Sequence, residues 1–298
     1  METLPSIFSL FKESFKIYKK YFWGLIGISV FLIFLILLDI FYIFHSLKAI
    51  LTPNQILTSN IIYQAIITLG SSIFFTIISL VLICAIKIYI SSEQKVKKII
   101  CWKKGISLIL PFFWIIILSF LVLVGGFYLL IIPGIIITIS LTFICYTLVF
   151  ENQKGLNSLL RSFQLIKGNW WRVFWRILCL MLCLILCLIF LTLLIYFILN
   201  NKIILSLLDK TSLELLKFII TIVIFFLITP PLILPLILIY GYLIFDALVK
   251  QKPLETFNPQ KKRKFFIALA IWGFLNIIAF SVILFQLLFQ KRSIFFFL

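Results

Sequence analysis

The sequence has few acidic residues and a single histidine, which limits the chemistry that the protein can perform. Nine Asp and Glu residues and one His occur among 298 residues. An active site needs a nucleophile, an acid or base and an electrophilic group close together. The GxSxG, HExxH and P-loop motifs are all missing. The sequence therefore predicts that the protein is not an enzyme and that it has no catalytic site, metal or cofactor.

Paired cysteines are also lacking, because none of the six cysteines belongs to a CxxC motif. Nothing in their spacing indicates a disulfide framework. Five lie in apolar runs, where a thiol acts as a small hydrophobic group, and Cys101 lies in a polar loop. Cys179, Cys183 and Cys187 recur at every fourth position of one run. Without a second cysteine-bearing helix to complete a metal site, we expect these three to serve close helix packing.

Apolar residues, in contrast, make up 64% of the chain, and charged residues only 12%. Soluble domains contain about 45–50% apolar and about 25% charged residues, so a water-soluble fold could not bury this much apolar surface. The net charge is +18, but Lys and Arg stand in short clusters between the apolar runs. Such clusters meet anionic headgroups and fix topology. We therefore predict an integral membrane protein whose partners are membrane lipids and not nucleic acid.

Seven apolar segments have the length of about 20 residues that a transmembrane helix needs. Residues 106–150 carry no charge and would be about 67 Å long as one helix, so they must fold back. Gly125-Gly126 and Ile132-Pro133-Gly134 mark the reversal, with Pro133 in the first turn of the returning helix. The predicted fold is an all-α polytopic bundle that spans the membrane at residues 23–44, 61–90, 106–124, 133–150, 172–199, 215–248 and 265–289.

The distribution of Lys and Arg predicts the topology of this bundle. With the N-terminus on the inner side, 21 of the 27 Lys and Arg residues fall on the inner side, as the positive-inside rule requires. We expect one membrane domain, residues 1–298, in the cell membrane, with the N-terminus cytoplasmic and the C-terminus outside. The sixth span contains Pro230, Pro231 and Pro235, so it is expected to be kinked or partly re-entrant.

Two further segments have the pattern of amphipathic helices that lie in the inner interface. Residues 5–22 place aromatic side chains on one side and lysines on the other, and residues 155–171 repeat this pattern. Residues 14–23 align without gaps to residues 162–171, a shift of 148 positions. We infer a parallel internal repeat with halves 1–150 and 151–298. A chance match of two aromatic and basic segments is the alternative.

Several short motifs between Leu130 and Trp171 also resemble a known group of families. The relevant residues are Leu130-Ile131-Ile132-Pro133-Gly134-Ile135, Val149-Phe150-Glu151, Gly155-Leu156, Arg161-Ser162 and the run from Leu165 to Trp171. They resemble the glycerophosphoryl diester phosphodiesterase membrane domain and related prokaryotic membrane families of unknown function. The resemblance covers most of the first 250 residues but departs at an alanine, where this chain has Asn157 or Ser158. It implies a helical membrane domain, and not the phosphodiesterase reaction, which belongs to a separate soluble barrel.

Three polar residues in or beside the spans are candidate polar sites, because a charge at the bilayer centre costs at least about 2.5 kcal/mol. Asp39 and His45 fall near the outer end of the first span. A solvated helix end is expected there, and a site for a cation or headgroup is the alternative. Asn276 lies near the middle of the seventh span, where we expect it to form an interhelical hydrogen bond.

The inner ends of the spans carry the remaining charged candidates. Glu151 and Asp246 end the fourth and sixth spans, and we expect them to pair with inner basic residues such as Arg161 or Arg172. Basic residues of the two amphipathic segments are predicted to bind lipid headgroups, namely Lys12, Lys16, Lys19, Lys20, Arg161, Lys167 and Arg172.

Taken together, these features predict a non-enzymatic membrane protein, either an anchor or scaffold or a factor in membrane organisation, whose inner face binds anionic lipid. The alternative is a transporter or permease component for an apolar or amphipathic solute, because broken helices can line a cavity. Proton-coupled transport is disfavoured, since no series of acidic or His residues crosses the core. An intramembrane enzyme that uses the four residues Asp39, His45, Glu151 and Asp246 is a third hypothesis. A second copy or another membrane protein remains open as a partner.

Overall fold

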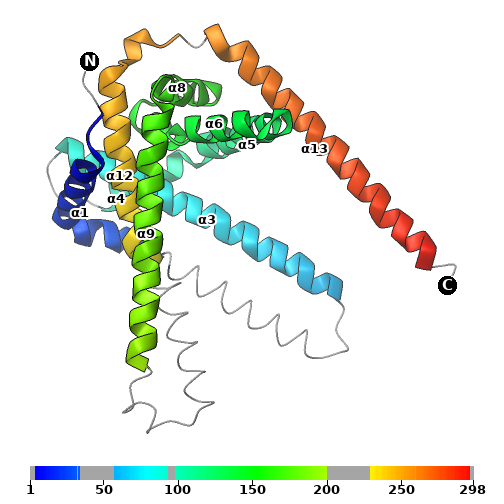
Figure 1. The fold of residues 1–298 in the computed structure, drawn as a ribbon, viewed down its shortest axis with the longest axis horizontal. Helices are drawn as coiled ribbons and strands as arrows, with labels where there is room; N and C mark the ends of the chain where they lie inside the picture. The colour runs from blue at the N-terminus through cyan, green and yellow to red at the C-terminus, as the bar shows by residue number, and fades with distance from the viewer. Residues whose placement is uncertain are drawn as a thin grey trace. The chain divides into compact units, whose positions relative to one another are not determined.

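In the computed structural model of the chain (Figure 1), residues 4–31, 33, 57–92, 98–199, 229–258 and 260–295 are described. Within these ranges the chain is helical apart from turns and short connections, and it contains no strand. The predicted all-α class is therefore confirmed. Among the described residues, six segments are long and apolar enough to cross a membrane, namely Ile73–Ile90, Ile109–Leu129, Ile131–Phe150, Trp170–Leu194, Pro231–Gln251 and Lys262–Ile283. Such a set is compatible with a multi-pass membrane protein.

Parts of two predicted spans fall outside the described residues. Most of the first span, residues 23–44, is among them, together with Asp39 and the following His45. Residues 215–228 of the sixth span also lie outside. The described part of that span begins at Thr229 and runs as one helix, α12 (Thr229–Gln251), with Pro235 inside it.

The chain divides into two compact units, which are described separately. The unit that contains helix α8 (Leu156–Ile166) consists of residues 1–4, 108–174 and 244–298 and is called the α8 unit. The unit that contains helix α1 (Ile7–Ser29) consists of residues 5–107 and 175–243 and is called the α1 unit. Each unit draws on both predicted repeat halves, so the units and the halves are different divisions of the chain.

A helical hairpin of α5 (Ile109–Leu129) and α6 (Ile131–Ser140) begins the α8 unit (Figure 1). The chain reverses at Leu130, whose extended backbone, φ −169° and ψ 156°, separates the two helices. Pro133 lies in the first turn of α6, as predicted, where a missing backbone N–H costs no hydrogen bond. The predicted hairpin is confirmed, and its reversal lies between the two sequences that were expected to mark it. Gly125 and Gly126 themselves lie inside α5, so the first helix ends at Leu129 and not at residue 124.

Gly125 allows two helices of the α8 unit to cross at close distance. It faces Gly273 of α13 (Gln260–Phe295), and a Cβ atom on Gly125 would lie 2.3 Å from the carbonyl oxygen of Leu269. A Cβ on Gly273 would lie 2.0 Å from the carbonyl oxygen of Leu121. Two glycines therefore let the backbones of α5 and α13 approach each other, the arrangement that small residues permit between membrane helices.

After α6, the chain forms α7 (Ile144–Phe150) and then the short helix α8 (Leu156–Ile166). Gly155 and Gly168 bracket α8 with φ values of +56° and +84°, which side-chain-bearing residues rarely adopt. The turn at residues 167–169 leads into α9 (Trp170–Leu199), where Trp171 stacks on Phe174 at 5.4 Å. Trp170 and Trp171 at this helix start have the position of an interfacial aromatic belt.

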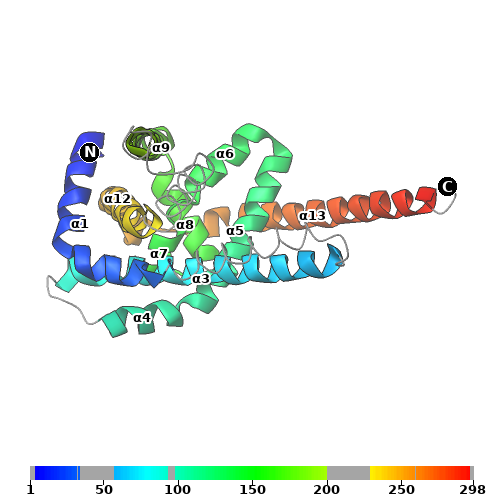
Figure 2. The ribbon, with the colours of Figure 1, turned by 90° about the horizontal axis from the view of Figure 1, so that it is seen from below.

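The α1 unit begins with α1 (Ile7–Ser29), which bends at Tyr21, where φ is −112° and ψ is 16°. Its second half lies beside α3 (Leu57–Ser92), as Figure 2 shows. Tyr21 stacks on Tyr89 of α3 with ring centroids 4.8 Å apart, and its hydroxyl donates a 2.9 Å hydrogen bond to the Tyr89 carbonyl. This packing fixes the bend. The next helix, α4 (Lys98–Ser107), also packs on α3.

The two predicted amphipathic segments are helical and share a burial pattern. In α1 the buried residues at four-residue spacing are Leu10, Ser14 and Tyr18, and the residues 148 positions later in α8, Ser158, Ser162 and Ile166, are also buried. The bend of α1 at Tyr21 corresponds to the turn at Asn169 that ends the α8 segment. The internal repeat itself stays a prediction.

Candidate functional site

The most enclosed charges of the α8 unit form an ion pair between Arg161 of α8 and Glu151, which follows α7. Arg161 Nη2 lies 2.7 Å from Glu151 Oε1, and Nε lies 2.8 Å from Oε2, so the contact is bidentate. The Arg161 side chain is 0% exposed and that of Glu151 is 9% exposed. The pairing predicted for Glu151 is confirmed. Arg161, which the sequence also suggested as a headgroup ligand, instead holds α8 in place, because its buried guanidinium is already occupied.

Lys252, directly after α12, completes this cluster. Its carbonyl accepts a 2.7 Å hydrogen bond from Arg161 Nη2. Its ammonium donates to the carbonyls of Gln164 and Leu165, at 2.9 and 3.0 Å, and to that of Lys167. These carbonyls lie at the C-terminal end of α8, where the last turn of a helix leaves carbonyl oxygens that a side chain can bind. Burial, followed by the charges of Lys167 and Arg161, lowers the pKa of Lys252 below its ordinary value. Lys252 therefore closes the C-terminus of α8.

Buried hydroxyl groups hold the other side of α8. Ser158 Oγ lies 2.6 Å from Thr147 Oγ1 of α7, and Ser162 Oγ donates a 2.7 Å hydrogen bond to the carbonyl of Ser140 in α6. Sequence reasoning missed these contacts and the role of Lys252. The four-residue spacing of Ser158 and Ser162 could have indicated that both hydroxyl groups lie on one face of α8. No local pattern connects residue 252 to residues 164–167, so the role of Lys252 had no signal in the sequence.

A small cavity of about 170 Å³ lies between the C-terminal half of α8 and the start of α13. Lys167, Lys262 and Asn258 bring polar groups to it, and Phe163 and Phe257 are among its apolar walls. Lys262 Nζ lies 4.2 Å from the centre of the Phe163 ring. Lys167 is exposed, as expected for a headgroup ligand, and so is Arg172 of α9. The seven described residues that line the cavity include no acidic one.

In the α1 unit, the first half of α1 separates its residues into a buried face and an exposed face. Leu10, Ser14 and Tyr18 are buried. On the outside, Phe8 and Phe15 are 81% and 60% exposed. All of the lysines predicted there to bind headgroups are exposed, namely Lys12, Lys16, Lys19 and Lys20.

Aromatic and basic side chains alternate along this exposed face. Phe8, Lys12, Phe15 and Lys19 follow one another at steps of four, three and four residues, which places them in one row along the helix. We call these four residues together with Lys16 the α1 surface. Apolar rings beside ammonium groups suit the boundary between acyl chains and headgroups.

Contacts within the α1 unit hold the N-terminal half of the helix that carries this surface. The Ser6 side chain caps the N-terminus of α1 by accepting from the Ser9 N–H. Arg176 of α9 donates to the Pro5 carbonyl at 2.7 and 3.1 Å. Tyr240 of α12 packs on Phe11 with ring centroids 5.1 Å apart, and its hydroxyl donates to the Arg176 carbonyl. The α1 surface is thus carried by an anchored helix.

The other predicted polar residues do not join these groups. Asp246 pairs with Lys250 at 2.7 Å, one helical turn away on α12, rather than with Arg161 or Arg172, because its partially exposed carboxylate lies closest to its own helical neighbour. Asn276 Nδ2 donates to the Trp272 carbonyl of its own helix at 2.8 Å, so the predicted interhelical bond is not formed there. Asp39 and His45 lie outside the described residues.

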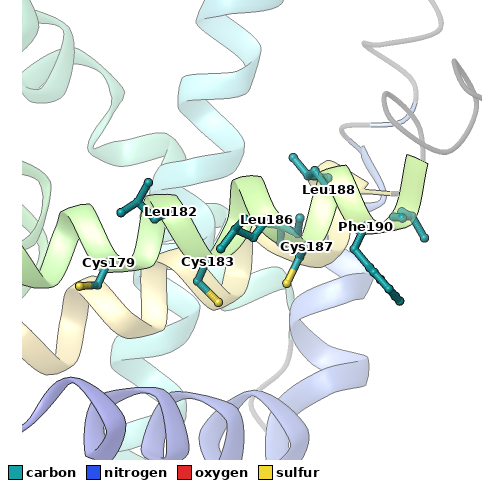
Figure 3. A pocket seen from close by; sticks show the side chains of 9 residues that line it. Cys179, Leu182, Cys183, Leu186, Cys187, Leu188 and Phe190 are labelled. Atoms are coloured by element: carbon teal, nitrogen blue, oxygen red, sulfur yellow. The ribbon is translucent and has the colours of Figure 1, made fainter. Parts of the chain in front are cut away.

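The cysteines differ from expectation in two respects. Cys179, Cys183 and Cys187 point from one side of α9 into an open apolar groove of about 720 Å³ (Figure 3), and Cys183 and Cys187 are exposed instead of closely packed. Cys101, predicted in a polar loop, is buried in α4, and burial raises the pKa of its thiol. No group of three or more His, Cys, Asp and Glu residues that could hold a metal occurs in the described ranges.

The six candidate spans in the described part of the chain indicate an integral membrane protein, and the family resemblance described above stays a prediction. Comparison of the chain with models of known protein families, with curated proteins and with solved structures gives no match.

Proposed function

We propose that this protein is a non-enzymatic membrane anchor, scaffold or membrane-organisation factor whose cytoplasmic face binds anionic lipid. The α1 surface carries the proposal. It combines exposed aromatic rings with exposed lysines on a helix whose opposite face is buried in protein. A helix that only packed in a protein core would not need such an outer face, whereas an interfacial helix does.

Charge distribution supports both the orientation and the lipid class. Each lysine near an anionic leaflet contributes about 1 kcal/mol of attraction. The lysines of α1 fall on the side where 21 of the 27 Lys and Arg residues lie if the N-terminus is cytoplasmic. We therefore assign the α1 surface to the cytoplasmic leaflet, with phosphatidylglycerol-type lipids as its partners.

Replacing Lys12, Lys16 and Lys19 with Gln in the full chain tests this function. We expect the preference for phosphatidylglycerol over phosphatidylcholine to fall by more than tenfold and by up to about a hundredfold, because up to about 1 kcal/mol is lost for each of the three lysines. Spin-labelled lipids in nanodiscs that contain both lipids measure this preference. The preference should also weaken at high salt, which screens exposed charges.

A triple Gln variant at Lys202, Lys210 and Lys217, in the segments predicted on the outer side, removes the same charge and is the matched control. It should keep most of the preference. Two results would disprove a lipid-binding role for the α1 surface. One is a wild-type protein that does not distinguish the two lipids, and the other is an equal loss of lipid preference in the control and α1 variants.

A further inference from the structure

The cavity between α8 and α13 belongs to the α8 unit and shares no residue with the α1 surface. Two charged side chains next to the cavity have partners within the protein. Arg161 pairs with Glu151, and the Lys252 ammonium donates to carbonyls at the C-terminal end of α8. Gln164, which lines the cavity, turns its Oε1 toward Arg161 Nη1 at 3.3 Å. These hydrogen bonds hold the α8 side of the cavity in place. Lys167 and Lys262 line the cavity and add two positive charges to it.

We propose that this cavity is a discrete binding site for the phosphate of an anionic phospholipid headgroup. This inference rests on the proposed function, since it names one defined site for the same class of anionic lipid. Lys167 comes from the turn after α8 and Lys262 from the first turns of α13, so the two ammonium groups approach from different elements. Ammonium groups from two sides form charge-assisted hydrogen bonds to phosphate oxygens.

The start of α13 adds to the attraction for an anion. Asn258 lines the cavity and caps this helix, because its Oδ1 accepts from the Gln260 N–H at 3.0 Å. The positive end of the dipole of a 36-residue helix therefore lies next to the cavity. The dipole is a contribution to the site, and the two lysines define it.

The apolar part of the lining favours a lipid over free inorganic phosphate. Leu160, Phe163 and Phe257 line the cavity beside the lysines. Free phosphate has no apolar part to bury there, whereas the acyl chains of a phospholipid begin close to its phosphate and are apolar. Trp170 and Trp171 begin α9 three residues beyond Lys167, and such aromatic residues are typical of headgroup depth.

The test compares two double variants of the full chain in nanodiscs of phosphatidylcholine with a minority of phosphatidylglycerol. Lys167→Gln with Lys262→Gln removes the cavity lysines. Arg263→Gln with Lys264→Gln removes the same charge from exposed positions of α13 that do not line the cavity. Native mass spectrometry counts the phosphatidylglycerol molecules that stay bound after release into detergent.

We expect one tightly held phosphatidylglycerol in the wild type and in the α13 control, and retention about tenfold or more weaker in the cavity variant, because it loses charged hydrogen bonds. Lys167→Arg with Lys262→Arg should restore retention. Equal retention in the cavity and control variants overturns the site. Displacement of the lipid by inorganic phosphate as effectively as by short-chain phosphatidylglycerol overturns the choice of a lipid ligand.

Failure of this site and failure of the proposed function give different results. If the α1 triple variant lowers the overall lipid preference while the cavity variant behaves as wild type, only the cavity site is disproved. If the wild type shows no preference for phosphatidylglycerol in either measurement, both proposals are disproved.

Discussion

Replacing Glu151 with Ala is expected to lower the free energy of unfolding by about 3–5 kcal/mol, because it leaves the buried guanidinium of Arg161 without its counter-ion. The effect should be large for two reasons. The Arg161 side chain is 0% exposed, so water cannot replace the carboxylate. Arg161 also binds the Lys252 carbonyl, and Lys252 closes the C-terminus of α8. Reversible unfolding in mixed micelles, followed by circular dichroism, measures the change.

Two controls separate this explanation from a general effect of removing an acidic residue. Asp246→Ala removes an exposed ion pair with the same 2.7 Å contact and should change stability by at most about 1 kcal/mol. Glu151→Leu combined with Arg161→Met removes both charges and should recover much of the loss, since a buried pair is often replaceable by apolar side chains. A Glu151→Ala variant as stable as Asp246→Ala would show that the pair is not buried as described.

Replacing Gly273 with Val is the second change with a large expected effect. A Cβ at this position would lie 2.0 Å from the Leu121 carbonyl oxygen and 2.9 Å from the Gly125 backbone nitrogen. These atoms belong to the α5 backbone and cannot move as a flexible side chain does, so the two helices must separate. Overpacking of this kind costs about 1–3 kcal/mol, and more where the backbone has to shift. The thermal midpoint in detergent should fall accordingly.

Gly70 of α3 provides the matched control, because a Cβ there would meet no atom within 4 Å. Gly70→Ala should be neutral or stabilise the protein by up to about 1 kcal/mol, since Ala favours a helix over Gly. Gly273→Ala should fall between the control and Gly273→Val. Identical midpoints for Gly273→Val and the wild type would mean that α5 and α13 do not cross at these glycines.

The predicted glycine turn shows where sequence reasoning reached its limit. A double glycine in a long apolar run can mark a reversal or a close helix crossing, and both require a missing side chain. The neighbours of Gly125 decide between them, and Leu269 and Gly273 lie more than 140 positions away in the sequence. Leu130, where the chain does reverse, lies between the two predicted spans, but it has no turn-forming character of its own, so the sequence did not indicate this exact residue.

Charged residues show the same division. The sequence placed Arg161 and Lys167 in one basic amphipathic segment and predicted the same headgroup-binding role for both. The structure separates them, because Arg161 is 0% exposed and paired with Glu151 while Lys167 is exposed beside a cavity. Helical periodicity gives the angular position of a side chain, but only the elements that pack around it decide whether it is buried.

The sequence by itself determined that the chain consists of apolar helices, that two amphipathic helices lie 148 positions apart, and that Glu151 pairs with a basic residue such as Arg161. These properties follow from composition and short periodic patterns, which local backbone geometry translates directly into helices. The tertiary structure alone decided the reversal at Leu130, the Gly125–Gly273 crossing, the role of Lys252 and the cavity beside Lys262. Each of these depends on contacts between residues that no local pattern connects.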